Sequence, residues 1–555
     1  MKNPLDMKPG ERLELALNSP RPYSLFQSLP SEDLLLMILD GNHDDVMLAM
    51  KYASEEQHRE IMDFYVWEKD CIRPDLAMDW LSRLLECGEK KMVKVIRKLD
   101  PELLIYVFKH YIHVIFHEDP NEPVSFTEEG LGDPRTMDGQ FYYFHKGADF
   151  LEVIDSIISR IFTLNYPAYW NLMQGCRYEL SMEILEGAFR WRTNRLEERG
   201  FADYLESRSI FKEMDERELE GLKLFSGGEP KISITAEEGK VISHSYFCCL
   251  PSHSLLKKAM AGLEEGEDAH AVMWETVLIM NKLISANLPS MHDKDQINAC
   301  LQGGADVLSL ALDYLSQGDL NAATEVLKKV KVETLFQAGH SLPRLLIKRL
   351  RSFLRESKVV GEETLFLLGQ PSADILQGIL HSPPLFFDPD AQAHVSFTKM
   401  DQLKLVERTL GQAQVLDRLF HEQFKLQLEG LKDLQSHGLY QEELTFSTLL
   451  MSGVCHIILD RHFEFRPVPE DRLAEVRRNA FQESEGSWRL KEEYASEFHR
   501  WYEEMTRGWE AEDRMLAKGL LEKWLAEFEE EFGSIHSESD IDPRFLKTIL
   551  VSSGK

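Results

Sequence analysis

The sequence lacks the features of a disulfide-bonded or membrane-spanning protein. Its 555 residues include seven cysteines, an odd number, and no Cys-x-x-Cys pair. No uninterrupted apolar run approaches the roughly 20 residues that a membrane-spanning helix needs. The first residues, Met-Lys-Asn-Pro-Leu-Asp, also lack the apolar centre of a secretory signal. We therefore expect a reduced, soluble protein of the cytoplasm with no membrane span.

Motifs that identify a reaction are missing too. The sequence contains no GxxxxGK[ST], no HExxH and no GxSxG. Its densest glycines, Gly227-Gly228 and Gly303-Gly304, form no GxGxxG phosphate cradle. We interpret Gly303-Gly304 as a turn before an apolar helix, and we expect neither a catalytic residue nor a cofactor.

Positive charge is scarce. The chain has 63 Lys and Arg against 94 Asp and Glu, which gives a net charge of −31. Such a surface repels phosphate backbones, so broad nucleic-acid binding is disfavoured. Two basic segments fit helices, Arg190-Trp-Arg192…Arg195 and Lys348-Arg-Leu-Arg351. We interpret both as solvated faces or as partners of nearby glutamates.

The sequence does contain a faint internal repeat near its start, with an offset of 47 residues that sets Gly41 beside Gly88. Apolar character is shared at further positions, at helical spacing. A helical repeat of this length is typical of HEAT- or armadillo-like arrays, in which each unit buries its apolar face against the next. The identical pairs are Leu34/Leu81, Val46/Val93, Lys51/Lys98 and Glu55/Glu102.

Helix-start signals accompany the repeat. Ser54-Glu-Glu-Gln57 is a capping box, in which Gln57 can return a hydrogen bond to the backbone of the cap residue. Asp100-Pro101-Glu102 places a cap residue before a proline at the first helical position. The two starts lie one residue out of phase in the repeat, which supports the alignment.

These helix starts carry a resemblance. Leu29-Pro-Ser-Glu-Asp-Leu34, Ala53-Ser-Glu-Glu56 and Leu99-Asp-Pro-Glu102, each followed by a helical pattern, resemble the intracellular N-terminal superhelix of MgtE magnesium transporters. FliG-type helical arrays have similar helix starts. The resemblance covers less than a fifth of the chain and implies a helical superhelix there. In MgtE this module precedes membrane helices, which the sequence lacks, so transport itself is not implied.

The whole chain also resembles a bacterial family of uncharacterised proteins of about this length. That family supplies no catalytic residues to transfer. The segments that carry the resemblance are Cys248-Cys-Leu-Pro-Ser252, Ala286-Asn-Leu288, Phe336-Gln-Ala-Gly339 and Phe387-Asp-Pro389.

We expect a mainly α fold with six parts. Alternating residues in Ile232–Thr235 and Val241–Phe247 predict a small β-hairpin. The last long helix, which Trp501 and Trp509 anchor, is expected to bend after Gly519. The parts are a helical-repeat domain over 1–117, an acidic loop over 118–149, a helical segment over 150–225, the hairpin plus a helical domain over 226–382, a linker over 383–400 and a C-terminal helical domain over 401–555.

The best candidate metal ligands are His110, His113 and His117. On a continuous helix their imidazoles would lie within about 60° of one another, and His113 and His117 would have the i, i+4 spacing that one ion can bridge. The alternative is that they face water or the next repeat and favour the helix C-terminus through its dipole.

The sequence thus predicts a non-catalytic, cytoplasmic helical scaffold or regulatory adaptor that binds protein partners. The alternative is a metal-dependent enzyme that uses the histidine face or an interdomain cleft near the hairpin. A third possibility, motivated by the MgtE-like start, is a sensor that controls a transporter in trans.

Overall fold

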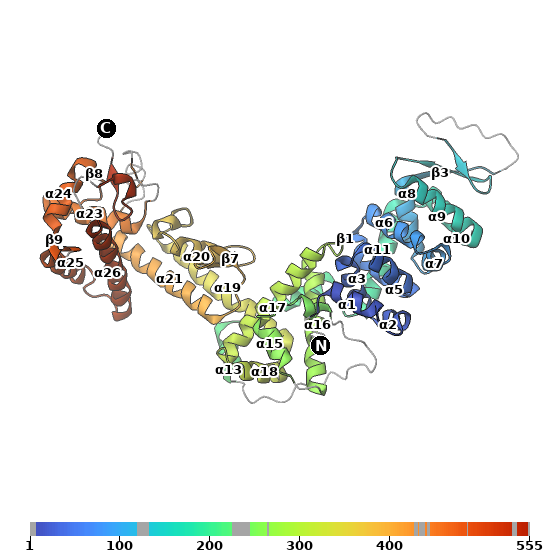
Figure 1. Ribbon diagram of the computed structural model, residues 1–555, viewed down its shortest axis with the longest axis horizontal. Coiled ribbons are helices and arrows are strands. Elements are labelled where there is room, and N and C mark those ends of the chain that lie inside the picture. Colours follow the sequence, from blue (N-terminus) through green and yellow to red (C-terminus); the bar gives the residue numbers. More distant parts are fainter. Residues whose placement is uncertain are drawn as a thin grey trace. The chain divides into compact units, whose positions relative to one another are not determined.

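A computed structural model describes the fold (Figure 1). It is mainly α-helical, as the sequence predicts. The chain forms two compact units, Met1–His340 and Ser341–Lys555, and the division falls within helix α19 (Val332–Glu356). The residues described are 7–118, 133–224, 245–263, 266–426, 431, 439–440, 444–484, 487–535 and 541–552.

The first unit begins with helices that recur in groups of three. The two identical apolar pairs of the repeat are buried, with Leu34 and Leu81 both 0% exposed and Val46 and Val93 both 4% exposed. The order of helices therefore follows the offset found in the sequence, while the HEAT-like or armadillo-like type of repeat stays a prediction. After α1 (Pro9–Leu17) and α2 (Pro22–Ser28), the groups are α3 (Ser31–Asp40), α4 (His43–Tyr52) and α5 (Glu55–Tyr65), then α6 (Pro74–Glu86), α7 (Glu89–Ile96) and α8 (Pro101–Tyr111).

The two helix starts in the repeat differ in their capping. At α5 the Gln57 backbone N–H donates to the Ser54 hydroxyl at 3.1 Å, and the Ser54 N–H donates to Gln57 Oε1 at 2.8 Å. This confirms the predicted capping box. At α8 the Asp100 side chain makes no capping hydrogen bond. Its carboxylate accepts from Arg195 instead.

A small antiparallel sheet follows α8, so the prediction of a loop over residues 118–149 is wrong for part of that range. The strands are β3 (Ile112–Phe116), β4 (Arg135–Thr136) and β5 (Phe141–His145), in the order β3-β5-β4. Ile112 and Val114 alternate with less buried residues, and the aromatic run of β5 buries Phe141 and Tyr143. Alternation and aromatic residues favour strands, and the apolar content of β5 outweighs its acidic surroundings.

The sheet is followed by α9 (Leu151–Leu164), α10 (Tyr166–Tyr178) and α11 (Ser181–Glu198). Helix α10 packs on α8 and α9, and α11 packs on α8 and α5. The first unit ends with α12 (Tyr204–Ser207), η2 (Arg208–Phe211), α13 (Glu216–Leu224), α14 (Ser245–Cys249), α15 (Leu255–Ala261), α16 (Glu267–Asn287), α17 (Lys294–Ser316), α18 (Leu320–Lys329) and the start of α19.

Two sequence predictions for this region are tested. The predicted hairpin at 232–247 lies mostly outside the described residues, and its last residues belong to helix α14, so the second strand does not extend to Phe247. The prediction of a turn at Gly303-Gly304 is wrong, because both glycines lie inside α17. A Cβ on Gly304 would come within 2.4 Å of Leu283 Cδ1, so this glycine allows close packing of α17 against α16.

The second unit is helical with short strand pairs. The predicted linker 383–400 contains the β6–β7 hairpin, whose turn includes Pro389 and Asp390. The elements are η3 (Glu362–Leu368), α20 (Ser372–Ile379), β6 (Phe386–Asp388), β7 (Ala393–Val395), α21 (Met400–Arg418), the π-helical turn η4 (Leu419–Gln423), α23 (Phe446–Asp460), β8 (Val468–Pro469), η5 (Glu470–Arg472), α24 (Leu473–Ala480), β9 (Phe481–Ser484), β10 (Ser487–Leu490), α25 (Glu492–Met505), α26 (Ala511–Gly533), η7 (Pro543–Phe545) and β11 (Val551–Ser552).

The predicted long helix near the C-terminus is two helices, α25 and α26. The break lies at 506–510, where Gly508 has a φ of 90°, and not after Gly519, which lies within α26. A left-handed glycine ends a helix readily. Trp509, just after this glycine, is 6% exposed, and Trp501 packs against Phe424 and Phe463.

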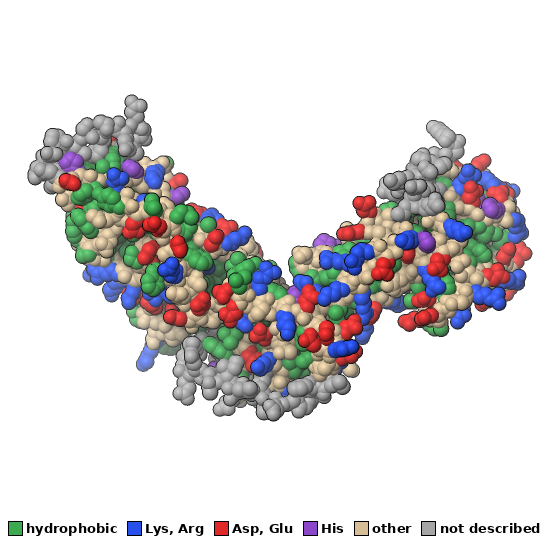
Figure 2. All heavy atoms as spheres, turned by 180° about the vertical axis from the view of Figure 1, so that it is seen from behind, with side chains coloured by type: hydrophobic (Ala, Val, Ile, Leu, Met, Phe, Trp, Pro, Cys, Tyr) green, Lys and Arg blue, Asp and Glu red, His purple; other side chains and the backbone are tan. Residues whose placement is uncertain are grey.

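The described surface carries both signs of charge. Figure 2 shows acidic and basic side chains interspersed over the face it displays. Among the described residues, no helix combines the length and the apolar character needed to cross a bilayer.

Candidate functional site beside helix α11

The structure separates the three histidines that the sequence grouped on a helix. His110 lies in α8, His113 lies in strand β3 and His117 follows that strand. Because four residues of extended chain span about 13 Å, His113 and His117 do not have the spacing that one ion bridges. The predicted helical face is therefore wrong. Within the described residues, which include all three histidines, no group of three or more His, Cys, Asp and Glu side chains could hold a metal ion.

Helix α11 instead brings three arginines to one face. Arg192 and Arg195 lie in the helix and Arg199 follows its last residue. At about 100° per residue, the three positions fall within about 60° of arc. The same side of the helix buries Ile184 and Ala188. The arginines therefore point toward the N-terminal helices on which α11 packs.

Arg195 forms ion pairs with two aspartates. Its Nε and Nη2 donate to the Asp63 carboxylate at 2.7 Å each, and its Nη2 and Nη1 donate to Asp100 at 2.6 and 3.1 Å. The Asp63 side chain is only 5% exposed. A guanidinium that binds both oxygens of each carboxylate fixes α11 to the end of α5 and the start of α8.

Arg199 continues this pairing. Its Nε and Nη2 donate to the two oxygens of Glu32 at 3.1 and 2.5 Å, and Glu60 accepts from the same guanidinium. Burial raises the pKa of the Glu32 carboxyl, and Arg199 opposes that shift. Three helices of the array, α3, α5 and α8, are thus tied to α11 or its C-terminal end through buried charges.

Arg192 differs from its two neighbours. Its Nε donates to the backbone carbonyl of Asp63 at 2.7 Å, and its Nη1 donates to the carbonyl of Lys69 at 3.5 Å. Its guanidinium lies over the Trp67 ring, 4.9 Å from the centroid. Within the described part of the chain, no carboxylate forms an ion pair with Arg192. Of its five N–H groups, three have no acceptor among the described residues.

The Lys69 carbonyl is positioned by a tight turn. Strands β1 (Trp67–Glu68) and β2 (Cys71–Ile72) pair antiparallel, with Lys69 and Asp70 between them. Lys69 has a φ of 59°. In a two-residue hairpin turn of type II′, the first residue has a positive φ, and glycine is favoured there. This turn places a backbone acceptor, not the lysine ammonium, against Arg192.

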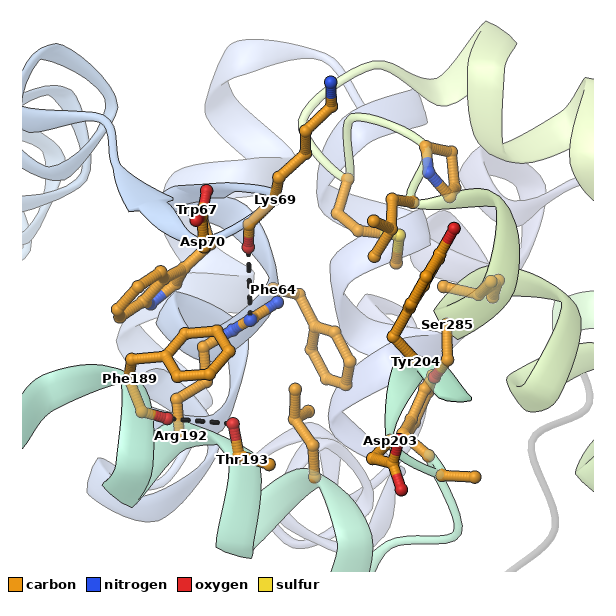
Figure 3. A pocket seen from close by; sticks show the side chains of 17 residues that line it. Phe64, Trp67, Lys69, Asp70, Phe189, Arg192, Thr193, Asp203, Tyr204 and Ser285 are labelled. Atoms are coloured by element: carbon orange, nitrogen blue, oxygen red, sulfur yellow. Dashed lines mark hydrogen bonds between the residues drawn. The ribbon is translucent and has the colours of Figure 1, made fainter. Parts of the chain in front are cut away.

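Arg192 borders a cavity of about 520 Å³. In Figure 3 its guanidinium lies between Trp67 and Phe64, and Tyr204 lies across the cavity. The Lys69 side chain extends away from the guanidinium. The remaining lining residues come from the β1–β2 turn, α11, the segment before α12, the end of α16 and the residues just after it: Asp70, Phe189, Thr193, Leu196, Phe201, Ala202, Asp203, Ile284, Ser285, Leu288, Pro289 and Met291.

The charge inside the cavity is not balanced by a paired group. Burial lowers the pKa of the Arg192 guanidinium to about 10, with the Asp63 charge opposing this shift and Arg195 adding to it. Asp203, on the lining, already accepts from the backbone N–H groups of Leu205 and Glu206 at 2.6 and 3.2 Å. The arrangement is a mainly apolar cavity with one cation whose donors are partly unused.

Exposed apolar side chains are frequent in the stretch of chain that includes α11. Of the eighteen large apolar side chains that are exposed among the described residues, nine lie between residues 164 and 205. Leu205 is 80% exposed and Trp191 is 52% exposed. We call the nine residues the α10–α12 apolar surface: Leu164, Tyr166, Tyr178, Leu180, Met182, Phe189, Trp191, Tyr204 and Leu205.

Sequence reasoning found part of this site. It singled out Arg192 and Arg195 as a local basic segment, and it was wrong to expect solvated side chains or glutamate partners for them. It missed Arg199 and the aspartates. The spacing 192, 195, 199 was available as a signal, because it places three cations on one helical face.

The fold and the site define a mainly α-helical protein in which an array of N-terminal helices is tied by half-buried arginines to a helix that borders a cavity. The profile of a family described as "Family of unknown function (DUF6178)" matches residues 2–552. The chain belongs to this family, as its resemblance to an uncharacterised family predicts. No curated protein and no solved structure matches it significantly, so the resemblance of its first helices to MgtE remains a prediction.

Proposed function

We propose that the protein is a non-catalytic adaptor of the cytoplasm that binds a protein partner through the α10–α12 apolar surface. The observation that carries the proposal is the concentration of exposed apolar side chains in this short stretch of the chain. Single exposed apolar residues are ordinary, whereas a cluster of them marks an interaction site.

Rigidity supports this proposal. The paired arginines Arg195 and Arg199 hold α11 against three other helices. A surface whose backbone is already fixed loses less conformational entropy when a partner binds. Tyrosine, tryptophan and phenylalanine are also the side chains that protein interfaces favour, and five of the nine residues of the surface are aromatic.

Site-specific crosslinking tests the proposal. A photoreactive amino acid replaces Leu205 in one variant and Met182 in another, and the cells from which the protein comes are irradiated. Met515, which is 75% exposed in the second unit, is the matched control position. We expect the same partner to crosslink from Leu205 and Met182 but not from Met515.

The partner is then purified and its affinity measured with Leu205→Glu and Met515→Glu variants. A buried charge at an apolar interface is costly, so we expect Leu205→Glu to weaken binding by at least about tenfold. Met515→Glu should leave the affinity unchanged. Crosslinks that are equally strong from Met515, or an affinity insensitive to Leu205→Glu, would refute the adaptor proposal.

A further inference from the structure

Arg192 is a cation with unused hydrogen-bond donors at the edge of an apolar cavity. Its Nε and one Nη1 hydrogen are directed to backbone carbonyls, which leaves three N–H groups without an acceptor among the described residues. The planar guanidinium matches the two oxygens of a carboxylate or phosphate. The cavity therefore presents donors in the geometry that an oxyanion uses.

The carboxylates near Arg192 bind other groups: Asp63 binds Arg195, and Asp203 accepts from backbone N–H groups. Arg195 and Arg199 each bind two carboxylates, whereas no described carboxylate pairs with Arg192. A cation held in protein surroundings without a partner is costly, and a bound anion would reduce that cost. Arg195, three residues away on the same face, has its donors occupied by Asp63 and Asp100.

The lining indicates the rest of the ligand. Aromatic and aliphatic side chains line the cavity, among them Trp67, Phe189 and Tyr204 (Figure 3). A cavity of about 520 Å³ is in the size range of small-molecule sites. Such a lining favours a ligand with an apolar or aromatic body.

The charges also distinguish a carboxylate from a phosphate. Asp70 and Asp203 contribute to the lining, and the Lys69 ammonium extends away from Arg192. A lining that contains one guanidinium and two carboxylates suits a single negative charge better than a phosphate dianion. A monoanion with one planar acceptor group fits best.

From these observations we infer that the cavity beside α11 binds an organic carboxylate with an apolar or aromatic body, whose oxygens accept from Arg192. The acid group belongs either to a free small molecule or to the C-terminus of a peptide. The inference does not rest on the proposed function, although Phe189 and Tyr204 belong both to the cavity lining and to the α10–α12 apolar surface.

Calorimetry of the full-length protein tests the inference with matched probes. The probes are indole-3-propionate, its amide and indole-3-ethyl phosphate. We expect the carboxylate to bind about ten- to a hundredfold more tightly than the amide, the range for hydrogen bonds to a charged group. We expect the phosphate to bind more weakly than the carboxylate. An amide that binds as tightly as the carboxylate, or absence of carboxylate binding, would overturn the inference.

Variants locate the site. Arg192→Gln should weaken carboxylate binding to the level of the amide, whereas Arg190→Gln on the same helix should not change it. Ser285→Phe fills the cavity without altering Arg192, so it should abolish binding while the protein stays folded. Full affinity in both Arg192→Gln and Ser285→Phe would show that the carboxylate binds elsewhere and would refute the inference.

A peptide arm distinguishes the two sources of the acid. Acetyl-Gly-Gly-Phe is compared with its C-terminal amide and with indole-3-propionate. Tighter binding of the free-acid peptide than of the small carboxylate assigns the site to a chain terminus. The reverse order assigns it to a small molecule. If neither free acid bound more tightly than its amide, the proposed role of Arg192 would be refuted.

Discussion

Arg192 and Arg195 are one turn apart on the same face of α11, yet their surroundings differ. Arg195 binds two aspartate side chains with four hydrogen bonds. Arg192 binds two backbone carbonyls and borders a cavity. Both contact the same stretch of chain at Asp63, one through its side chain and the other through its carbonyl oxygen. The two arginines therefore differ in their partners: carboxylates bind the Arg195 guanidinium, whereas among the described residues only neutral carbonyls bind that of Arg192.

The comparison shows how to distinguish an arginine that stabilises the fold from one that can bind a ligand. An arginine whose donors are occupied by carboxylates of its own chain contributes to folding and offers little to a ligand. An arginine that is oriented by neutral carbonyls keeps both its charge and part of its donor set. Side-chain partners, rather than position on the helix, therefore distinguish the two roles.

The largest expected effect concerns Arg195. Arg195→Ala leaves Asp63 and Asp100 without their partner in a buried position, which costs about 3–5 kcal/mol of the free energy of unfolding. Chemical denaturation of the first unit measures this loss. Arg190→Ala is the control, because Arg190 pairs with Glu186 only at the exposed surface and such pairs contribute about 0.3–0.5 kcal/mol.

Arg192→Ala completes this experiment. We expect a smaller loss of stability than for Arg195→Ala, because no carboxylate is left unpaired. Equal losses in the two variants would break the comparison, since Arg192 would then be as much an anchor as Arg195.

The second prediction tests the array through acid. His58 in α5 is 0% exposed, its Nε2 donates to the Met50 carbonyl at 2.8 Å, and burial lowers its pKa to about 3. The unfolded chain takes up a proton near pH 6.5 while the folded chain does not. Stability is therefore complete above about pH 6.5 and falls as the pH drops toward 3. At pH 5 the loss is about 2 kcal/mol.

The measurement is the difference in unfolding free energy between pH 7.5 and pH 5, in the wild type and in His58→Gln. The variant should lose about 2 kcal/mol less between the two values, because glutamine does not titrate. The positive charge of Lys91 also lowers the pKa of the His58 imidazole. An identical pH dependence in the two proteins would show that His58 remains accessible to protons in the folded state.

The sequence allowed the helical array to be predicted because its signals are local. Capping by Ser54 and burial of Leu34 and Leu81 follow from spacing along the chain alone. The sheet after α8 was missed because β3 continues the helical apolar pattern without a breaker. Its partner β5 is 25 residues or more away in the chain, and only their pairing reveals the strand.

The site was less accessible to sequence reasoning. Asp63 and Arg195 are separated by 132 residues, and no local pattern indicates that they meet. Asp100 was identified correctly as the residue before a helix, but its side chain pairs with Arg195 rather than capping. A carboxylate at a helix start can serve either purpose, and the presence of an arginine nearby decides between them.

The third prediction measures a cap within the array. Ser54→Ala removes the hydroxyl that accepts from the Gln57 N–H at the start of α5. Loss of such a cap costs about 1 kcal/mol. Denaturation should show this decrease, which is smaller than that of Arg195→Ala, and affinity for carboxylate should stay unchanged. A loss as large as that of Arg195→Ala would contradict this order. The cap of α5 would then contribute as much to the free energy of unfolding as the ion pairs of Arg195.

The smallest effect is expected at Lys69. Lys69→Gly relieves a positive φ that costs a non-glycine residue about 1–2 kcal/mol, and the greater freedom of glycine in the unfolded chain offsets most of this gain. The unfolding free energy should therefore change by less than about 1 kcal/mol. Affinity for carboxylate should not change, because the Lys69 group that contacts Arg192 is a backbone carbonyl. Suppose that Lys69→Gly weakened carboxylate binding as much as Arg192→Gln. The Lys69 ammonium would then be a second cation of the cavity. The unused donors of Arg192 would no longer be enough to explain why the anion binds beside it.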